Sequence, residues 1–147
     1  MRKGYRFLIQ TVYLLIAFAF LVAPVFSQEK RDTSEATSSE KLKLGQAVMC
    51  EGIRDYKPEN VAVVFSTTIG KVSCFTAFDV VPEQTVIYHK WFHKDNPSTE
   101  KRLTLQPPSW ASYSSIQLRE TDKGPWRVEV YDQDGNLLHT LRFSITD

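Results

Sequence analysis

Two histidines four residues apart, His89 and His93, have the residue type and the proximity that a metal site could use. On an α-helix they would share one face, but here they lie on or just after a β-rich run, where four residues span about 13 Å. The segment also lacks the glutamate that a zinc-hydrolase helix places beside its first histidine ligand. His139 has no evident partner, so we expect neither a metal site nor a cofactor.

Two cysteines, Cys50 and Cys74, lie on different predicted strands, 24 positions apart (74 − 50). In an oxidising compartment a disulfide between them would be worth on the order of 3 kcal/mol by the chain-entropy estimate. A redox or nucleophilic thiol would need a CxxC spacing or a cationic neighbour, and neither is visible. We therefore predict a structural disulfide. Two buried free thiols are the alternative if the chain goes to another compartment.

No pattern in the sequence predicts catalysis, and we name no catalytic residue. Asp132, Asp134 and Asn136 resemble the opening of a calcium loop, but the glycine stands at its fourth position rather than its sixth. A phenylalanine stands at the twelfth position, where a bidentate glutamate is needed, so a hairpin turn is the better interpretation. There is no GxSxG elbow and no phosphate-binding glycine loop. We expect a protein that is not an enzyme and rank a hydrolase, with His89 near the serines of residues 109–115, third.

Aromatic side chains are the strongest candidates for binding, namely Trp91, Trp110 and Tyr113. Such rings stack on sugars and anchor protein interfaces, but they also fill the cores of β-sandwiches. Core packing is favoured for Trp91 and Trp126, whereas Trp110 follows a Pro-Pro-Ser segment that could leave its ring at the rim of the fold. Basic residues that could flank a binding site are Lys90, Lys94, Lys101 and Arg102, although solubility is the favoured explanation for them.

β-Strands must position these residues, because short alternating runs recur from Leu44 onward and no window has a helical period. In the clearest run Trp126, Val128 and Val130 share one face, and a turn at residues 132–135 leads into a returning strand, which together predict a C-terminal hairpin. The eight predicted strands are Ala47–Ile53, Val61–Thr67, Val72–Phe78, Thr85–Phe92, Lys101–Leu105, Ser112–Leu118, Trp126–Tyr131 and Leu137–Ile145. Prolines, glycines and asparagines between them, such as Pro58, are interpreted as strand breakers.

This spacing predicts an all-β fold, an immunoglobulin-like antiparallel β-sandwich of about seven or eight strands over residues 44–147. Residues 1–27 have a basic start, an apolar stretch and short residues before Gln28, which is typical of a signal peptide. An uncleaved membrane anchor is the alternative, because the apolar stretch is about long enough to cross a bilayer. Residues 28–43 are polar and predict a flexible linker.

Four ordered segments carry a resemblance to a known family: VSCFT at residues 72–76, YHKWF at 88–92, SWASYS at 109–114 and GPWRVEV at 124–130, followed by DGNLL at 134–138. The chain resembles the bacterial domain-of-unknown-function family numbered 2914. This resemblance implies an exported or membrane-associated all-β module with no assigned activity. Ala111 and Ile116 stand where the family usually carries basic residues, so a role of those cations would be missing here.

The 147 residues carry 18 basic and 17 acidic side chains, and a net charge of +1 excludes the basic surface that nucleic-acid binding requires. We expect a non-catalytic envelope module, periplasmic or secreted, that binds an envelope protein or a cell-wall glycan through Trp110 and Tyr113. The alternative is a structural domain that an uncleaved anchor displays outside the cytoplasm within an envelope assembly. Contact with the membrane is expected only if the leader is retained.

Overall fold

The computed structural model describes residues 41–147 of the chain. The predicted signal peptide and almost all of the predicted linker lie outside the described residues. The described part forms nine β-strands in two sheets, with two short 3₁₀-helices and no α-helix. No helix within residues 41–147 is long and apolar enough to cross a bilayer.

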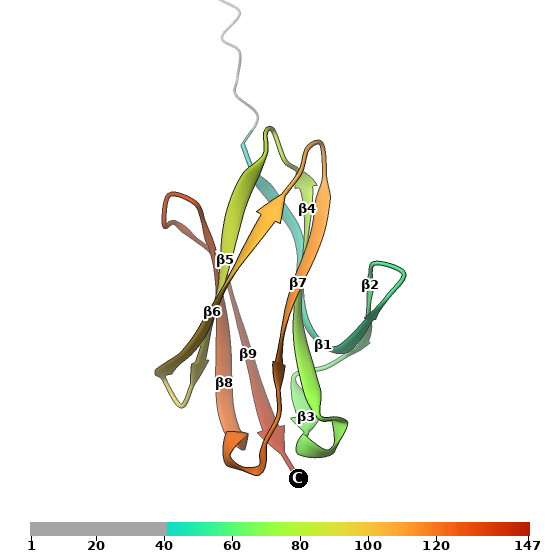
Figure 1. The fold of residues 1–147 in the computed structure, drawn as a ribbon, viewed down its shortest axis with the longest axis vertical. Coiled ribbons are helices and arrows are strands. Elements are labelled where there is room, and N and C mark those ends of the chain that lie inside the picture. The colour runs from blue at the N-terminus through green and yellow to red at the C-terminus, as the bar shows by residue number, and fades with distance from the viewer. Residues whose placement is uncertain (1–40) are drawn as a thin grey trace, which may run out of the picture. The chain divides into compact units, whose positions relative to one another are not determined.

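The two sheets contain four and five strands (Figure 1). The four-stranded sheet has the order β2-β1-β4-β7, with β1 at Lys43–Arg54, β2 at Lys57–Val61, β4 at Lys71–Val80 and β7 at Trp110–Gln117. The five-stranded sheet has the order β3-β9-β8-β5-β6, with β3 at Val64–Ser66, β5 at Thr85–His93, β6 at Asn96–Leu105, β8 at Gly124–Asp132 and β9 at Leu137–Thr146. The 3₁₀-helices are η1 (Thr67–Ile69) and η2 (Glu120–Asp122).

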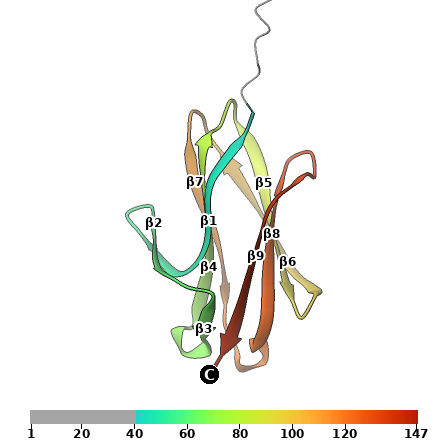
Figure 2. The same cartoon turned by 180° about the vertical axis from the view of Figure 1, so that it is seen from behind.

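The sheets form a sandwich because alternate residues of both present apolar side chains to the space between them. Figure 2 shows β1 and β4 in one layer and β8 and β9 in the other. One core cluster joins Met49, Val72 and Cys74 of the four-stranded sheet to residues of the other sheet, and a second cluster surrounds Phe78 and Ile87. Within the first cluster, Trp91 meets Phe143 edge to face, with ring centroids 6.1 Å apart.

All eight predicted strands overlap an observed one, and the ninth observed strand, β2, contains Pro58, which was predicted to break a strand. Proline is tolerated there because β2 lies at the edge of its sheet, where a missing N–H leaves no neighbour unpaired. The predicted strand Val61–Thr67 is divided: Val61 ends β2, and β3 joins the other sheet. Because β3 pairs with β9 in parallel, the prediction of a wholly antiparallel sandwich is wrong at this edge.

The predicted disulfide is also wrong, because Cys50 and Cys74 are both free and buried. The register of β1 and β4 places Met49 opposite Cys74, and Cys50 opposite Ser73. Since successive side chains of a strand point to opposite faces, Cys74 points into the core and Cys50 points to the outer face of the same sheet. The spacing of the two cysteines in the sequence contains no information on this register.

Both thiols are held in their neutral form. Burial raises the pKa of Cys50 to about 11, and burial raises the pKa of Cys74 further. The Cys50 thiol lies 3.7 Å from the carbonyl oxygen of Ser73, to which it donates. Because the thiolate is the reactive form, neither cysteine is poised for redox or nucleophilic chemistry.

These observations predict that a maleimide will leave the native protein unmodified and will add to both Cys50 and Cys74 after unfolding in guanidinium chloride without reductant. Intact mass spectrometry counts the adducts, and the same experiment with reductant is the control. A count that rises only when reductant is added would show that the two cysteines are bonded after all.

Candidate interaction surface

Trp91 does not contribute to any surface, although it was predicted as a candidate binding residue. Its side chain is only 1% exposed and lies between the sheets, together with the fully buried His89 two residues earlier on β5. Both residues face β4 and β7 of the opposite sheet. Trp91 is therefore a core residue, as the favoured alternative interpretation predicted.

A continuous chain of hydrogen bonds crosses the sandwich at His89. The indole N–H of Trp91 donates to Ser114 Oγ over 3.1 Å, and Ser114 Oγ lies 2.9 Å from His89 Nδ1. On the other side of the ring, His89 Nε2 lies 3.3 Å from Thr76 Oγ1, whose hydroxyl donates to the carbonyl oxygen of Ser112 over 3.4 Å.

Only one proton arrangement satisfies every group in this chain. Ser114 accepts from Trp91 and must donate to Nδ1, while Thr76 donates to a carbonyl and must accept from Nε2–H. His89 is thus neutral, with its proton on Nε2. Burial lowers the pKa of His89 from 6.5 to about 4.

Trp110 and Tyr113, the other two predicted binding residues, lie on opposite faces of β7. Trp110 pairs with the core residue Phe78 and points to the inner side at the end of the strand, where 42% of it remains exposed. Tyr113 pairs with Phe75, points to the outer face and is 52% exposed. The two rings therefore cannot form one stacking site, which differs from the prediction that they act together.

Tyr113 instead borders a shallow hollow on the outer face of the four-stranded sheet. The hollow has a volume of about 140 Å³ and is lined by Ile53, Tyr56, Phe75, Ala111, Ser112 and Tyr113. Phe75 is only 3% exposed although it lies on the outer face, whereas Tyr56 is 86% exposed at the tip of the β1–β2 hairpin. An aromatic floor with two tyrosines at its border is the most distinctive surface feature of the described residues.

The backbone of the β1–β2 turn explains the position of Tyr56. Asp55 and Tyr56 are its two central residues, with φ values of 48° and 59°, so both are left-handed as a type I′ hairpin requires. Such turns are normally recognised by Asn-Gly or Asp-Gly, and an Asp-Tyr pair does not give that signal. Tyr56 was therefore not predicted from the sequence, and Phe75 was not predicted because it alternates with the core residues of β4.

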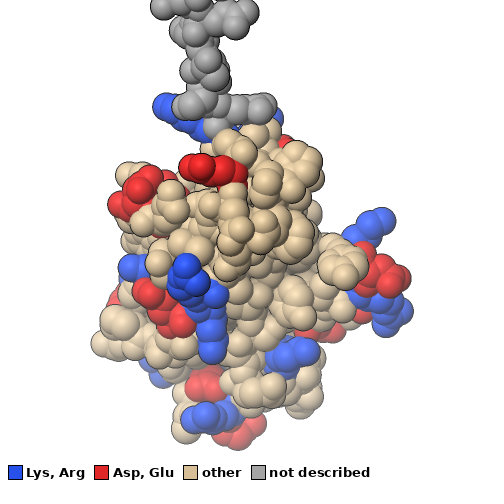
Figure 3. All heavy atoms as spheres, turned by 45° about the horizontal axis from the view of Figure 1, so that its top comes forward, with Lys and Arg blue, Asp and Glu red and all other residues tan. Residues whose placement is uncertain are grey.

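The outward residues around the hollow are uncharged, although both sheets carry charges elsewhere on their outer faces. Around the hollow, the outward residues of β4 and β7 are Ser73, Phe75, Ala77, Ala111, Tyr113 and Ser115, none of them charged. Farther along the four-stranded sheet, Arg54 pairs with Glu59 at 3.0 Å. On the five-stranded sheet, Lys90 pairs with Glu100 at 3.5 Å and Arg127 pairs with Glu129 at 2.8 Å. Figure 3 shows acidic and basic side chains interspersed on the face drawn there, without a continuous patch of either sign.

The basic residues predicted to flank the site belong to the five-stranded sheet or its β5–β6 turn. Lys90 lies over the ring of Tyr131, with its Nζ 4.6 Å from the centroid, and Lys94 is in the turn. Arg102 of β6 lies opposite Tyr88 of β5. Only Lys101 approaches β7, because it borders a groove with Ser115 and Gln117. The predicted arrangement of all four cations around Trp110 and Tyr113 is not present.

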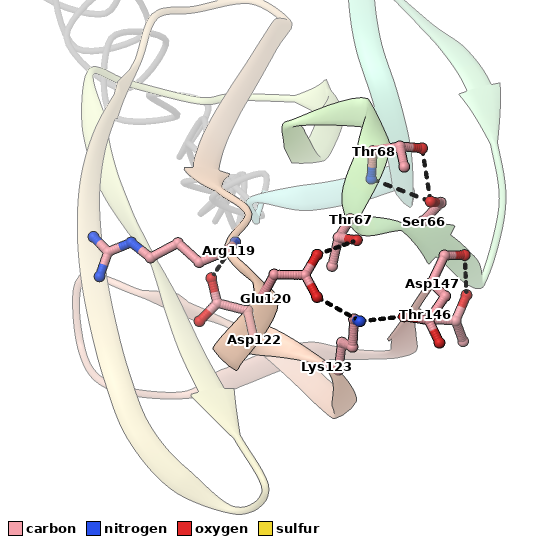
Figure 4. A network of polar contacts seen from close by, with 9 residues as sticks. All are labelled: Ser66, Thr67, Thr68, Arg119, Glu120, Asp122, Lys123, Thr146 and Asp147. Carbon is pink, nitrogen blue, oxygen red and sulfur yellow. Dashed lines mark hydrogen bonds and ion pairs between the residues drawn. The ribbon is translucent and has the colours of Figure 1, made fainter.

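A polar network closes the end of the sandwich where β3 and β9 finish (Figure 4). Lys123 forms ion pairs with Glu120, at 2.6 Å, and with Asp147. Glu120 also accepts from Thr67 Oγ1 at 3.3 Å, which ties η2 to η1. These contacts join the two 3₁₀-helices and the end of β9.

The residues that resemble a calcium loop form the β8–β9 turn, as predicted. One carboxylate oxygen of Asp132 accepts from the backbone N–H groups of Asp134 and Asn136, and the other accepts from the Asn136 side chain. The carboxylate of Asp132 is thus occupied by the turn itself, which accounts for these residue types.

Residues 84–145 match a family described as "Protein of unknown function (DUF2914)". The resemblance that the sequence motifs predicted is confirmed over these residues, which extend from β5 into β9. The VSCFT segment of β4 lies outside the match, and so do Phe75 and Tyr56 of the hollow. Where the family was expected to carry basic residues, Ala111 lines the hollow and Ile116 packs against the core. No curated protein matches this chain.

The lowered pKa of His89 predicts a fall in stability on acidification. In the unfolded chain His89 binds a proton near pH 6.5, but in the folded protein it does so only near pH 4. The contribution of His89 to the free energy of unfolding is therefore complete above pH 6.5 and is lost as the pH falls to 4. The free energy of unfolding should decrease by about 3 kcal/mol over that interval on account of His89 alone. Urea unfolding at several pH values measures it.

His89→Gln is the informative variant, because a glutamine amide can accept from Ser114 and donate to Thr76 but does not titrate. Its stability should depend much less on pH between 6.5 and 4, while the exposed His139→Gln control should behave like the parent protein. Equal pH dependence in His89→Gln and the parent would contradict this assignment.

Proposed function

Because residues 84–145 match a family whose function is unknown, we propose from the geometry that this chain is a non-catalytic interaction module that binds a protein partner through the outer face of its four-stranded sheet. The observation that carries the proposal is the uncharged hollow of Tyr56, Phe75 and Tyr113. The outer face of a sheet in water normally carries polar side chains, and exposed aromatic anchors are typical of interfaces.

The polarity of the hollow favours a protein over a glycan. Sugar recognition combines an aromatic platform with polar groups that fix the hydroxyls. Near the hollow, the hydroxyls of Ser73 and Ser115 lie 2.8 Å apart and bond to each other. An apolar side chain of a protein partner fits such a floor better, and Tyr56 and Tyr113 can retain their hydroxyls in water at the border.

The position of His89 supports a role without catalysis. It was the histidine considered for a hydrolase, but it is fully buried and both of its ring nitrogens are engaged by Thr76 and Ser114. A general base must reach the substrate proton within hydrogen-bond distance. In this protein the imidazole is part of the core.

We also infer that the sandwich is immunoglobulin-like. The order β9-β8-β5 in one sheet, opposite β1-β4-β7 in the other, corresponds to strands G-F-C opposite A-B-E of that fold. The buried Trp91 on β5 occupies the strand on which immunoglobulin domains carry their core tryptophan, and Cys74 on β4 lies in the same core cluster. The cluster contains Val128 of β8, on the strand where those domains carry the second cysteine of the disulfide.

The location of the module outside the cytoplasm is proposed from residues 1–27 alone, as a cleaved signal peptide. The basic start and apolar stretch support export to the periplasm or the medium. A retained anchor that displays a structural domain within an envelope assembly is the second candidate, and the length of the same apolar stretch favours it.

The leader proposal predicts that the protein recovered from the periplasm or medium begins at Gln28. N-terminal sequencing or intact mass measurement tests this directly. A mature chain that retains residues 1–27 and sediments with membranes would contradict cleavage and would support the anchored domain.

The binding proposal predicts that a photo-crosslinking phenylalanine analogue at position 56 or 113 captures the same envelope protein in the living cell. The same analogue at Tyr88, on the outer face of the five-stranded sheet, is the matched control and should capture much less. For the purified partner, Tyr56→Ala and Tyr113→Ala should each weaken binding about tenfold or more.

Equal capture from positions 56, 88 and 113 would contradict a specific surface. Binding to cell-wall glycan that Tyr113→Ala abolishes, without any captured protein, would replace the protein partner by a glycan. A product of twice the chain mass from position 113 would show self-association at that residue.

A further inference from the structure

We propose that two copies of this chain join through the edge of β7, so that the four-stranded sheet continues across a two-fold axis. The inference goes beyond the proposed function, because a partner at the hollow is not needed for it. It rests on the sequence of β7, on the other sheet edges and on the exposed position of Trp110.

β7 is the last strand of the order β2-β1-β4-β7, so within residues 41–147 it has a paired neighbour on one side only. Alternate N–H and C=O groups of its eight residues therefore point away from β4 without a strand partner. The strand reads WASYSSIQ and contains neither a charged residue nor a proline. An edge of this length and composition is a template for another strand.

The three other edges of the described sheets are protected in ways that β7 is not. β2 carries Lys57, Pro58 and Glu59 within five residues, and β6 carries Pro97, Glu100, Lys101 and Arg102. β3 is only three residues long, and the part of β9 that it does not pair with carries Arg142. The part of β1 that β2 does not pair with carries Lys43 and two shifts of register. Charges, prolines and short length are the usual means by which proteins prevent edge pairing, and each of these edges has at least one of them.

A second copy is the occupant that suits this edge. In an antiparallel pair related by a two-fold axis, β7 meets β7, so the incoming strand is as free of charge as the strand that receives it. An axis perpendicular to the sheet places residues of the same face opposite each other. Ser112 and Ser114 then face each other on the inner side, and their small side chains permit close approach.

One register also accounts for the exposed tryptophan. In this register the two-fold axis passes through Tyr113, so the two residue numbers of each opposed pair add up to 226. Trp110 of one copy therefore lies opposite Ile116 of the other. Both residues point to the inner side of the sheet, and Trp110 is 42% exposed in the single chain. Burial of this aromatic ring against an aliphatic side chain would favour that register over its neighbours.

The charges beside β7 lie at one end of the strand. Lys101, Arg119 and Asp122 border the groove beside the C-terminal half of β7. Because the pairing is antiparallel, the C-terminal half of β7 in one copy lies against the N-terminal half of β7 in the other copy. The two lysines are therefore on opposite sides of the axis, separated along the strands.

The first test is the mass of the purified natural chain, with its native N-terminus, as a function of concentration by sedimentation equilibrium. We expect a reversible monomer–dimer equilibrium. Tyr113→Lys places two positive charges at the axis and should raise the dimer dissociation constant at least tenfold. Thr104→Lys, an exposed position on the already charged β6, is the control and should leave it unchanged.

The second test fixes the interface by cysteine crosslinking. Tyr113→Cys should form a covalent dimer with oxidised glutathione, because position 113 faces its own counterpart, whereas Gln117→Cys should not. The native Cys50 and Cys74 are buried and should not react. A chain that remains monomeric at all concentrations, a dimer that Tyr113→Lys does not weaken, or a dimer without the crosslink at position 113 would each overturn the proposal.

The tests of the β7 dimer give results that can be distinguished from the tests of the proposed function. A heterologous partner is captured from position 56 at the hairpin tip, which the edge pairing does not use. Loss of the dimer with retained capture at position 56 would overturn the present inference alone.

Discussion

The hydrogen-bonded chain from Trp91 through Ser114 and His89 to Thr76 is the constraint on which the rest of the sandwich depends. It lies between two apolar clusters and joins β5 of one sheet to β4 and β7 of the other. Apolar contacts tolerate small sliding of one sheet over the other, but four buried polar groups are satisfied in only one relative position. An unpaired buried polar group costs about 1–3 kcal/mol, so the chain fixes the alignment of the sheets.

This alignment decides which residues reach the surface. With Thr76 and Ser114 directed inward, the alternation of β4 and β7 must direct Phe75 and Tyr113 outward, where they form the aromatic hollow. The same alternation sends Cys50 and Cys74 to opposite sides of their sheet. The aromatic hollow, the free thiols and the buried histidine are therefore consequences of one register.

Much of the fold could be predicted from the sequence, because the strands have strong local signals. The run around Trp126 alternates cleanly, and the turn after it carries Asp and Gly, so the C-terminal hairpin was placed within one or two residues. Features that depend on which strands are neighbours in a sheet could not be predicted from the sequence in the same way. Pro58 breaks a central strand but not an edge strand, and a single sequence does not state which strands lie at an edge.

The candidate site was less predictable for the same reason. Tyr113 was identified by its residue type, but its pairing with Trp110 failed, because an odd separation of three along a strand places side chains on opposite faces. Tyr56 and Phe75 depend on the hairpin geometry and on the cross-strand register. Trp91 was proposed as a binding residue with core packing as the favoured alternative, and its 1% exposure makes it part of the core.

Pro58 has a consequence for the size that any assembly can reach. Growth of a sheet by addition of chains requires an accepting strand at both ends, as in fibrils. In this protein the end opposite β7 is β2, where a residue without an N–H group sits between a lysine and a glutamate. A strand that is added beyond β2 would find no N–H donor at Pro58, so in the proposed pair this position resists further growth of the sheet on both sides.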